Sequence, residues 1–169
     1  MMPSLTIAKE REFIMFKGSL IKILITSAAG QPMQEVKEAR AVPGKGLEGD
    51  RYYSDAGQYS AKPGPGRQVT LIEIETLEAM KDETGIELQA AEARRNLVTC
   101  GVPLNQLVDK QFQVGEVVLR GVRLCEPCTY LEGMTQPGVR AALVHRGGLR
   151  ADILKAGTLH TGDVVTPIE

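Results

Sequence analysis

Short runs of aliphatic and β-branched residues, separated by glycines and prolines, dominate the hydrophobic pattern of the chain. The clearest run covers residues 20–26 and predicts a first strand. The pattern predicts further strands at residues 68–72, 96–100, 111–114 and 117–124, an extended segment at 35–42, and two terminal β-segments around a turn at 162–163. Because the strands are short and do not alternate regularly with helices, we expect a mainly β fold with minor α content, in a barrel or closed sheet.

Two or three short helices are expected between these strands. The first should begin near Glu73, where apolar residues recur at helical spacing, and should stop at Gly85. Alanine-rich residues 88–94 are expected to form a second helix, and residues 140–155 are expected to be partly helical.

The domain organisation that the chain predicts is simple. Residues 1–18 are expected to be an N-terminal tail or edge segment, and residues 19–169 to form one domain. The segments 43–51 and 62–67 are rich in glycine and proline, so we expect them to be loops rather than regular structure.

Composition and charge exclude several classes of protein. Of the 169 residues, 43% are hydrophobic and 24% are charged, which excludes a disordered chain. The net charge of −1, from 20 basic and 21 acidic residues, argues against a protein that coats nucleic acid. No apolar stretch approaches the ~20 residues of a membrane span, and charged residues 9–12 interrupt any secretory signal. We therefore expect a cytoplasmic protein with neither a nucleic-acid nor a membrane partner.

Three cysteines, Cys100, Cys125 and Cys128, are too few for a disulfide scaffold and fit a reducing compartment. A structural zinc site at Cys125 and Cys128 would need two more ligands. The other candidates are Cys100, His145 and His160, and none is spaced as a second zinc knuckle. No zinc is therefore expected.

The Cys125–Cys128 pair leaves three further interpretations open. A dithiol redox centre should lie at the start of a helix, but the segment 130–133 is expected to be too short to form one. Alternatively, the segment carries one functional thiol, held by Pro127 at the end of a strand. A buried cysteine without a chemical role is the third interpretation.

Arginines beside glycines suggest a site for an anionic ligand. The guanidinium group binds phosphate through two hydrogen bonds, and glycine lets backbone amides approach it. The arginines of interest, most of which lie in or beside glycine-rich turns, are Arg51, Arg67, Arg94, Arg95, Arg123, Arg140, Arg146 and Arg150. Any one of them taken alone is more often a solvated surface residue, and loop arginines are expected to support folding little. No Walker motif or dinucleotide fingerprint is present, so a nucleotide is not specifically indicated.

Taken in order, these motifs resemble the MOSC domain, which is named for the C-terminal domain of molybdenum cofactor sulfurases. The matching stretches are Gly46-Leu-Glu-Gly-Asp-Arg51, Arg67-Gln-Val-Thr-Leu-Ile-Glu-Ile-Glu75, Arg94-Arg-Asn-Leu-Val-Thr99, Gly115-Glu-Val-Val-Leu119, Cys125-Glu-Pro-Cys128 and His145-Arg-Gly-Gly-Leu-Arg150. Each is weak by itself, whereas the ordered set is specific and extends from about residue 19 to 166.

The resemblance implies a closed β-barrel of the pyruvate-kinase type that binds the molybdenum cofactor, a phosphate-bearing pyranopterin dithiolene. In related amidoxime-reducing proteins a cysteine at the position of Cys128 ligates molybdenum, and in sulfurase-type members that position is proposed to carry or transfer sulfur. A thiolate is a suitable soft ligand, and arginines lower its pKa. The residues expected to bind the cofactor are Arg51, Arg67, Arg95, Asn96, His145 and Arg146.

Two departures from the larger family members leave the activity open. The chain lacks the extra N-terminal barrel of the amidoxime-reducing proteins and the desulfurase domain that mobilises sulfur with pyridoxal phosphate. It is therefore expected to be a cofactor carrier, a sulfur transferase, or a small molybdenum-dependent reductase subunit acting on N-hydroxylated compounds. Its partner would be a cysteine desulfurase, a molybdoenzyme or a redox protein. A dithiol oxidoreductase and a non-catalytic binding module are the rival hypotheses.

Overall fold

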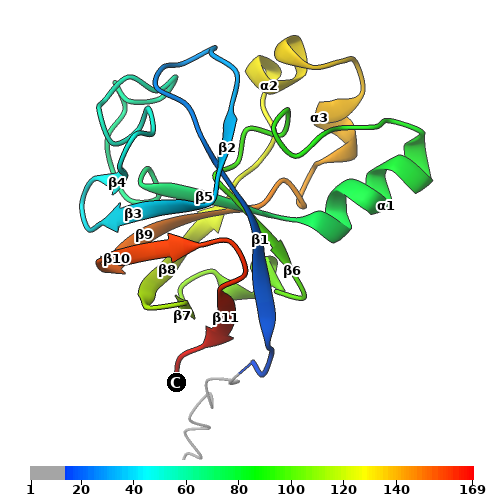
Figure 1. Cartoon of the computed structure of the whole chain (residues 1–169). Coiled ribbons are helices and arrows are strands. Elements are labelled where there is room, and N and C mark those ends of the chain that lie inside the picture. The colour runs from blue at the N-terminus through cyan, green and yellow to red at the C-terminus, as the bar shows by residue number, and fades with distance from the viewer. Residues whose placement is uncertain (1–13) are drawn as a thin grey trace, which may run out of the picture.

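A computed structural model of the chain describes residues 14–169, which form strands connected by loops and three short helices (Figure 1). The strands are β1 (Gly18–Ile25), β2 (Gln34–Val36), β3 (Glu38–Val42), β4 (Gly46–Leu47), β5 (Val69–Glu73), β6 (Leu97–Cys100), β7 (Gln111–Val114), β8 (Val117–Leu124), β9 (Leu149–Lys155), β10 (Gly157–His160) and β11 (Val164–Pro167). The helices are α1 (Ile74–Thr84), α2 (Thr129–Met134) and α3 (Val139–Ala142), with a 3₁₀ turn η1 at Leu104–Leu107. The mainly β fold class is confirmed.

Seven of the strands within residues 14–169 close into a barrel. The large sheet has the order β11-β7-β8-β9-β5-β6-β1, with β2 added at the free edge of β1. The barrel closes because β1 also pairs with β11, where Gly18 lies opposite Val165 and Ser19 opposite Val164 (Figure 1). The predicted closed barrel is therefore confirmed.

A smaller sheet of three strands, β10-β3-β4, packs beside the barrel. Here β3 is antiparallel to β10, with Ala39 opposite Leu159, and β3 also pairs with the short strand β4. The extended segment predicted at 35–42 is therefore two strands, because β2 joins the large sheet and β3 the small one. The terminal segments β10 and β11 likewise belong to different sheets.

Helix α1 connects β5 to β6, the parallel strand pair of the large sheet. Its Leu77 and Met80 are buried against the outside of the barrel, and Gly85 ends it with a left-handed φ of 74°. That conformation favours glycine, which explains why the predicted stop is correct. Figure 1 shows α1, α2 and α3 gathered at one end of the barrel.

The barrel wall separates two hydrophobic clusters. The inner cluster fills the barrel and includes Leu20, Leu71, Leu97, Phe112, Leu119, Leu149, Ile153 and Val165. The outer cluster lies between the wall and the helices and includes Leu24, Ile72, Leu77, Met80, Val98, Leu131, Val139 and Leu143. Side chains that alternate along β5 and β6 therefore belong to opposite clusters, as expected of strands buried on both faces.

Three local predictions differ from the structure. Residues 88–94 form turns rather than a helix, because the chain folds back through Arg94, whose φ is 58°, before entering β6. The segment 140–155 is helical only at α3, and its second half is strand β9, which alternates between buried and more exposed side chains. Residues 129–134 do form a short helix, α2, whose Leu131 is buried in the outer cluster.

The predicted N-terminal segment, 1–18, lies mostly outside the described residues, and β1 begins at Gly18. Among the helices of residues 14–169, none is long and apolar enough to cross a membrane.

Candidate functional site

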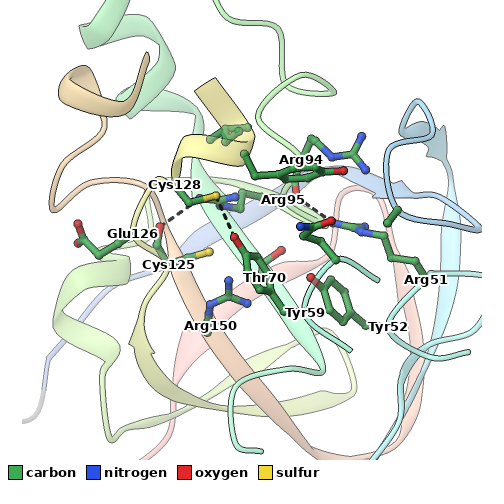
Figure 2. Close-up of a pocket in the computed structure, with 14 residues that line it drawn as sticks. Arg51, Tyr52, Tyr59, Thr70, Arg94, Arg95, Cys125, Glu126, Cys128 and Arg150 are labelled. Atoms are coloured by element: carbon green, nitrogen blue, oxygen red, sulfur yellow. Dashed lines mark hydrogen bonds between the residues drawn. The ribbon is translucent and has the colours of Figure 1, made fainter. Parts of the chain in front are cut away.

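A pocket at the helical end of the barrel brings together several of the residues singled out in the sequence (Figure 2). It is lined by Ala29, Arg51, Tyr52, Gln58, Tyr59, Thr70, Arg94, Arg95, Cys125, Glu126, Cys128, Tyr130, Leu131 and Arg150. Three predicted site residues, Cys128, Arg51 and Arg95, are thus parts of one cavity although they lie on separate segments of the chain.

Cys128 lies where the segment after β8 enters α2. It is the residue before the first turn of that helix, with extended backbone angles. Its side chain is partly buried and packs against the outer cluster. The hydroxyl of Tyr59 donates a hydrogen bond to the Cys128 sulfur over 3.1 Å (Figure 2). The thiol therefore has a defined position between a helix start and a phenol.

The environment of Cys128 favours the thiolate. Burial alone raises the pKa of this thiol, because it disfavours the charged form. The hydrogen bonds from the Tyr59 hydroxyl and from the backbone N–H groups of Leu131 and Tyr130, together with the positive charge of Arg95, outweigh burial and lower the pKa below its ordinary value. The result is a thiol suited to act as a nucleophile or a soft metal ligand.

Cys125 lines the same pocket but is held more tightly. It is 1% exposed, and its backbone N–H donates to the carbonyl of Gly148 over 2.7 Å. A Cβ at Gly147 would collide with the carbonyl oxygen of Cys125, so only glycine lets these two segments approach so closely. The Arg146-Gly-Gly-Leu motif therefore shapes the backbone beneath the cysteine pair.

Arg95 links the segments around the cysteines through hydrogen bonds to their backbone. Its guanidinium donates to the carbonyl oxygens of Gly147 (2.9 Å), Cys125 (3.1 Å) and Ala93 (3.3 Å). Its residue exposure is 8%, so the expectation of an exposed loop arginine is wrong for Arg95. The side chain supports the loops of the pocket and also places a positive charge near Cys128.

Arg51 is also buried, with 6% exposure, and its nearest partner is the carboxylate of Asp50 at 3.1 Å. A second, longer contact reaches the carbonyl oxygen of Arg94 over 3.4 Å, and the guanidinium lies over the ring of Tyr52 at 4.9 Å. Asp50 is itself fixed, because it accepts a hydrogen bond from the backbone N–H of Thr26. Arg51 is thus a rigid cation at one wall of the pocket.

Two further arginines line the pocket and were not among the predicted site residues. Arg94 donates to the carbonyl of Gln31 over 2.7 Å, and burial, followed by the nearby charge of Arg51, lowers its pKa. Arg150 lies over the ring of Tyr59 at 5.9 Å. Four guanidinium groups therefore line one pocket, whereas Glu126 is the single carboxylate in its lining.

The other predicted site residues lie elsewhere. Arg67 does not line the pocket, although its guanidinium lies over the Tyr59 ring at 5.1 Å. Asn96 is 1% exposed and is bonded to Thr70 and to the carbonyl of Leu24, which joins neighbouring strands. It therefore supports the barrel wall.

His145 and Arg146 are not among the residues that line the pocket. His145 is exposed and contacts Glu126 over 3.3 Å. Arg146 donates to the carbonyl of Ala142 over 2.6 Å and forms an ion pair with Glu83 over 2.8 Å. Tyr59, by contrast, is central to the site, and the sequence carries no local signal for it, because the tyrosine lies in an irregular loop 69 positions from its cysteine partner.

The donor set limits what the site can hold. Within residues 14–169, no group of three or more His, Cys, Asp or Glu side chains is placed to hold a metal ion. A metal at Cys128 would therefore need most of its ligands from a bound molecule. The surrounding guanidinium groups suit a ligand that carries negative charge.

Comparisons with known proteins agree on the fold. The family model of the MOSC domain matches residues 58–166, and no curated protein gives a significant match. The crystal structure of the YuaD protein from Bacillus subtilis is similar with a TM-score of 0.76 and 16% identity, covering 94% of this chain and 100% of that one. YiiM from Geobacillus stearothermophilus gives a TM-score of 0.68 and 13% identity, covering 90% of this chain and 75% of YiiM. YiiM from Escherichia coli gives 0.62 and 15%, covering 92% and 70%.

Proposed function

The chain belongs to the MOSC domain family, and from this membership we propose that the pocket around Cys128 binds the molybdenum cofactor. The observation that carries the proposal is the coincidence of a thiol whose pKa is lowered with four guanidinium groups in one cavity. Cys128 is the protein ligand, which either holds molybdenum or carries sulfur.

The chemistry of the donor set fits this cofactor. A thiolate is a soft ligand of the kind that molybdenum accepts from proteins, and the cofactor brings its own dithiolene sulfurs as further ligands. When bound, the cofactor supplies a molybdenum centre that can change oxidation state or carry a transferable sulfur. The residues of this chain bind and orient it and favour the thiolate form of Cys128.

The anionic part of the cofactor is proposed to lie against the arginines. Arg51 and Arg95 are each fixed by hydrogen bonds to the protein, so their charges are in place before a ligand arrives. The backbone of Arg150 is part of β9, but within the described residues its guanidinium makes no hydrogen bond or ion pair and lies over the Tyr59 ring. Arg150 is therefore the guanidinium most available to a phosphate group.

The proposal is tested by metal and pterin analysis of protein purified from cells that make the cofactor. We expect molybdenum and a fluorescent pterin in the wild-type protein and loss of molybdenum in Cys128→Ser. Cys100→Ser is the matched control, because Cys100 is exposed and does not line the pocket. Wild-type protein without molybdenum and pterin, or a Cys128→Ser variant that keeps both, would contradict the proposal.

A dithiol oxidoreductase is the second candidate function, because Cys125 and Cys128 line the same pocket and a helix follows Cys128. Oxidation would join the two sulfur atoms and pass two electrons and two protons to a disulfide substrate, which becomes two thiols. A reversible Cys125–Cys128 disulfide near cytosolic redox poise, with equal loss of activity in both serine variants, would favour this function. Loss confined to Cys128→Ser would favour the cofactor.

The partners proposed for the first function follow from its chemistry. A sulfur carrier receives sulfur from a cysteine desulfurase or delivers it to a molybdoenzyme, and a reductase subunit receives electrons from a redox protein. We propose that these exchanges take place in the cytoplasm. Co-purification of molybdenum-loaded protein with a cysteine desulfurase, a molybdoenzyme or a redox protein would identify which of these exchanges takes place.

A further inference from the structure

Two arginines lie directly opposite each other on neighbouring strands of the barrel. Arg123, near the end of β8, is the antiparallel partner of Arg150 in β9. Like charges at opposed positions of a sheet are destabilising, because their Cβ atoms lie about 5 Å apart on one face. Burial, the charge of Arg150 and the charge of Arg67 lower the pKa of Arg123. The strands therefore hold positive charges together at a cost in stability.

The register of the two strands brings this pair about. Gly121 of β8 lies opposite Ala151, but the register then shifts, and Arg123 lies opposite Arg150. A shift of this kind puts an extra residue into one strand and redirects the side chains beside it. Glycine is required before the shift, because a Cβ at Gly121 would collide with the carbonyl oxygen of Leu107. The opposition of the two arginines is thus built into the sheet.

Arg67 brings a third guanidinium to the same place. It lies just before β5, and β5 pairs with β9 on the side away from β8 (Figure 1). The guanidinium groups of Arg67 and Arg150 lie over the ring of Tyr59 at 5.1 and 5.9 Å. Arg123 is tied to the segment before Arg67, because its guanidinium donates to the carbonyl of Pro65 over 2.7 Å. Three neighbouring strands therefore contribute to one cluster of arginines.

The charge of this cluster is not balanced by the protein. Within residues 14–169, none of the three arginines takes part in an ion pair. The carboxylate of Asp152, on β9, is engaged by other donors: it accepts hydrogen bonds from the N–H of Gly66 over 2.7 Å and from the amide of Gln68 over 3.3 Å. Each guanidinium carries five N–H donors, so most of them remain available to a ligand. A bound anion would offset the repulsion and use these donors.

We propose that Arg67, Arg123 and Arg150 form a binding site for a phosphate group at the rim of the pocket. A phosphate monoester presents three acceptor oxygens and a charge of about −1.5 to −2, which suits three neighbouring guanidinium groups. A carboxylate offers two oxygens and a single charge. The planar fork of each guanidinium also matches the geometry of phosphate oxygens.

The phosphate has two possible sources, because Arg150 also lines the pocket of Cys128. It belongs either to a molecule seated in that pocket or to a separate molecule. The site itself follows from the arginines and does not depend on the proposed function. Its assignment to the phosphate of the molybdenum cofactor rests on that function.

The experiment is calorimetric titration of the full chain with inorganic phosphate at constant ionic strength, chloride being the ion replaced. The protein is produced in cells that cannot make the cofactor, so that no cofactor phosphate competes. We expect saturable binding of one phosphate per chain. Arg123→Gln should weaken it about 10- to 100-fold, because a charge-assisted hydrogen bond is lost. Arg67→Gln should have a similar effect from another strand, so that the result does not depend on how well one variant folds.

Arg120→Gln is the matched control. Arg120 is exposed on the same strand as Arg123, but it is paired with Asp109 over 3.7 Å and does not belong to the cluster. The variant loses the same charge and should bind phosphate as the wild type does. Absence of saturable phosphate binding in the wild type, unchanged affinity in Arg123→Gln and Arg67→Gln, or equal weakening in Arg120→Gln would overturn the inference.

Molybdenum and pterin analysis of the same variants, purified from cells that make the cofactor, identifies the source of the phosphate. Lower contents in Arg123→Gln than in Arg120→Gln would assign the site to the cofactor, and equal contents would assign it to a separate phosphate-bearing molecule. The proposed function fails separately. A wild-type protein without molybdenum that still binds phosphate through Arg123 would refute cofactor binding and leave the phosphate site intact.

Discussion

Replacing Arg95 with alanine removes one side chain that bonds to three segments of the pocket at once. The guanidinium donates to the carbonyl oxygens of Ala93, Cys125 and Gly147, at distances of 2.9 to 3.3 Å. These carbonyls belong to the turn before β6, the cysteine segment and the glycine loop before β9. The substitution should therefore loosen the site and destabilise the fold together.

The size of the loss follows from these contacts. A hydrogen bond from a charged donor contributes about 1.5–3 kcal/mol, but three bonds from one group are not additive. Because Arg95 lines an open pocket, water can reach part of the space that alanine leaves. We expect a loss of about 3–5 kcal/mol in the free energy of unfolding, a large share of the ~5–15 kcal/mol typical of a domain.

Equilibrium unfolding in urea measures this effect. With a slope of about 2 kcal/mol/M, the midpoint of Arg95→Ala should fall by about 1.5–2.5 M without a change in slope. Arg95→Lys should recover part of the loss, since an ammonium group keeps the charge but lacks the planar fork. The same two variants also test the effect of the Arg95 charge on Cys128. The pH midpoint of Cys128 alkylation should rise in Arg95→Ala and rise less in Arg95→Lys, because lysine keeps a positive charge.

Arg146→Ala is the control for Arg95. This arginine is anchored by the Ala142 carbonyl and Glu83 at the protein surface, outside the pocket lining, so we expect a loss below about 1 kcal/mol. If Arg95→Ala also lost less than about 1 kcal/mol, the three contacts would not support the fold in the way argued, and the reasoning would be refuted.

Two further predictions concern buried charge. Arg51→Ala leaves the buried Asp50 carboxylate without its cation, so the free energy of unfolding in urea should fall by about 2–4 kcal/mol. The double variant Arg51→Ala/Asp50→Asn should recover part of this loss, and no recovery would count against the ion pair. Burial, followed by the charge of Glu75, raises the pKa of Glu73 to about 6, so its contribution to stability is fully present below about pH 4.5 and is lost as pH rises through about 6. Glu73→Gln should therefore raise the melting temperature at about pH 8 and leave it nearly unchanged at about pH 4; an equal gain at both would contradict this assignment.

The strands were predictable wherever a short apolar run lies between turn residues. Strands β7 and β8 begin and end at the predicted residues, because Gly115 and Glu116 separate two runs of strongly β-forming residues. Strand β9 was missed, although Leu149, Ala151 and Ile153 alternate with less buried residues. Taken as one segment, residues 140–155 have no single period, because they join the end of helix α3 to strand β9 across Gly147 and Gly148.

The candidate site was only partly predictable. Cys128 and the arginines are visible from residue type and from their glycine neighbours. Which arginines meet in the pocket depends on the tertiary fold, because Arg51 and Arg150 lie far apart in the sequence. The contact between Tyr59 and Cys128 also depends on the tertiary fold, because the loop that carries the tyrosine has no periodic pattern from which its position could be predicted. Local sequence therefore indicates which residue types act in the site but not which residues contact one another there.

The pairing of β1 with β11 has a consequence for how the chain folds as it is made. Gly18 and Ser19 leave the ribosome long before Val165 and Val164, the residues they pair with. During that interval this edge of β1 offers unpaired N–H and C=O groups to any neighbouring chain. Contacts between residues so far apart in sequence also form slowly. Closure of the barrel must therefore wait for β11, and the delay is the period in which aggregation competes with folding.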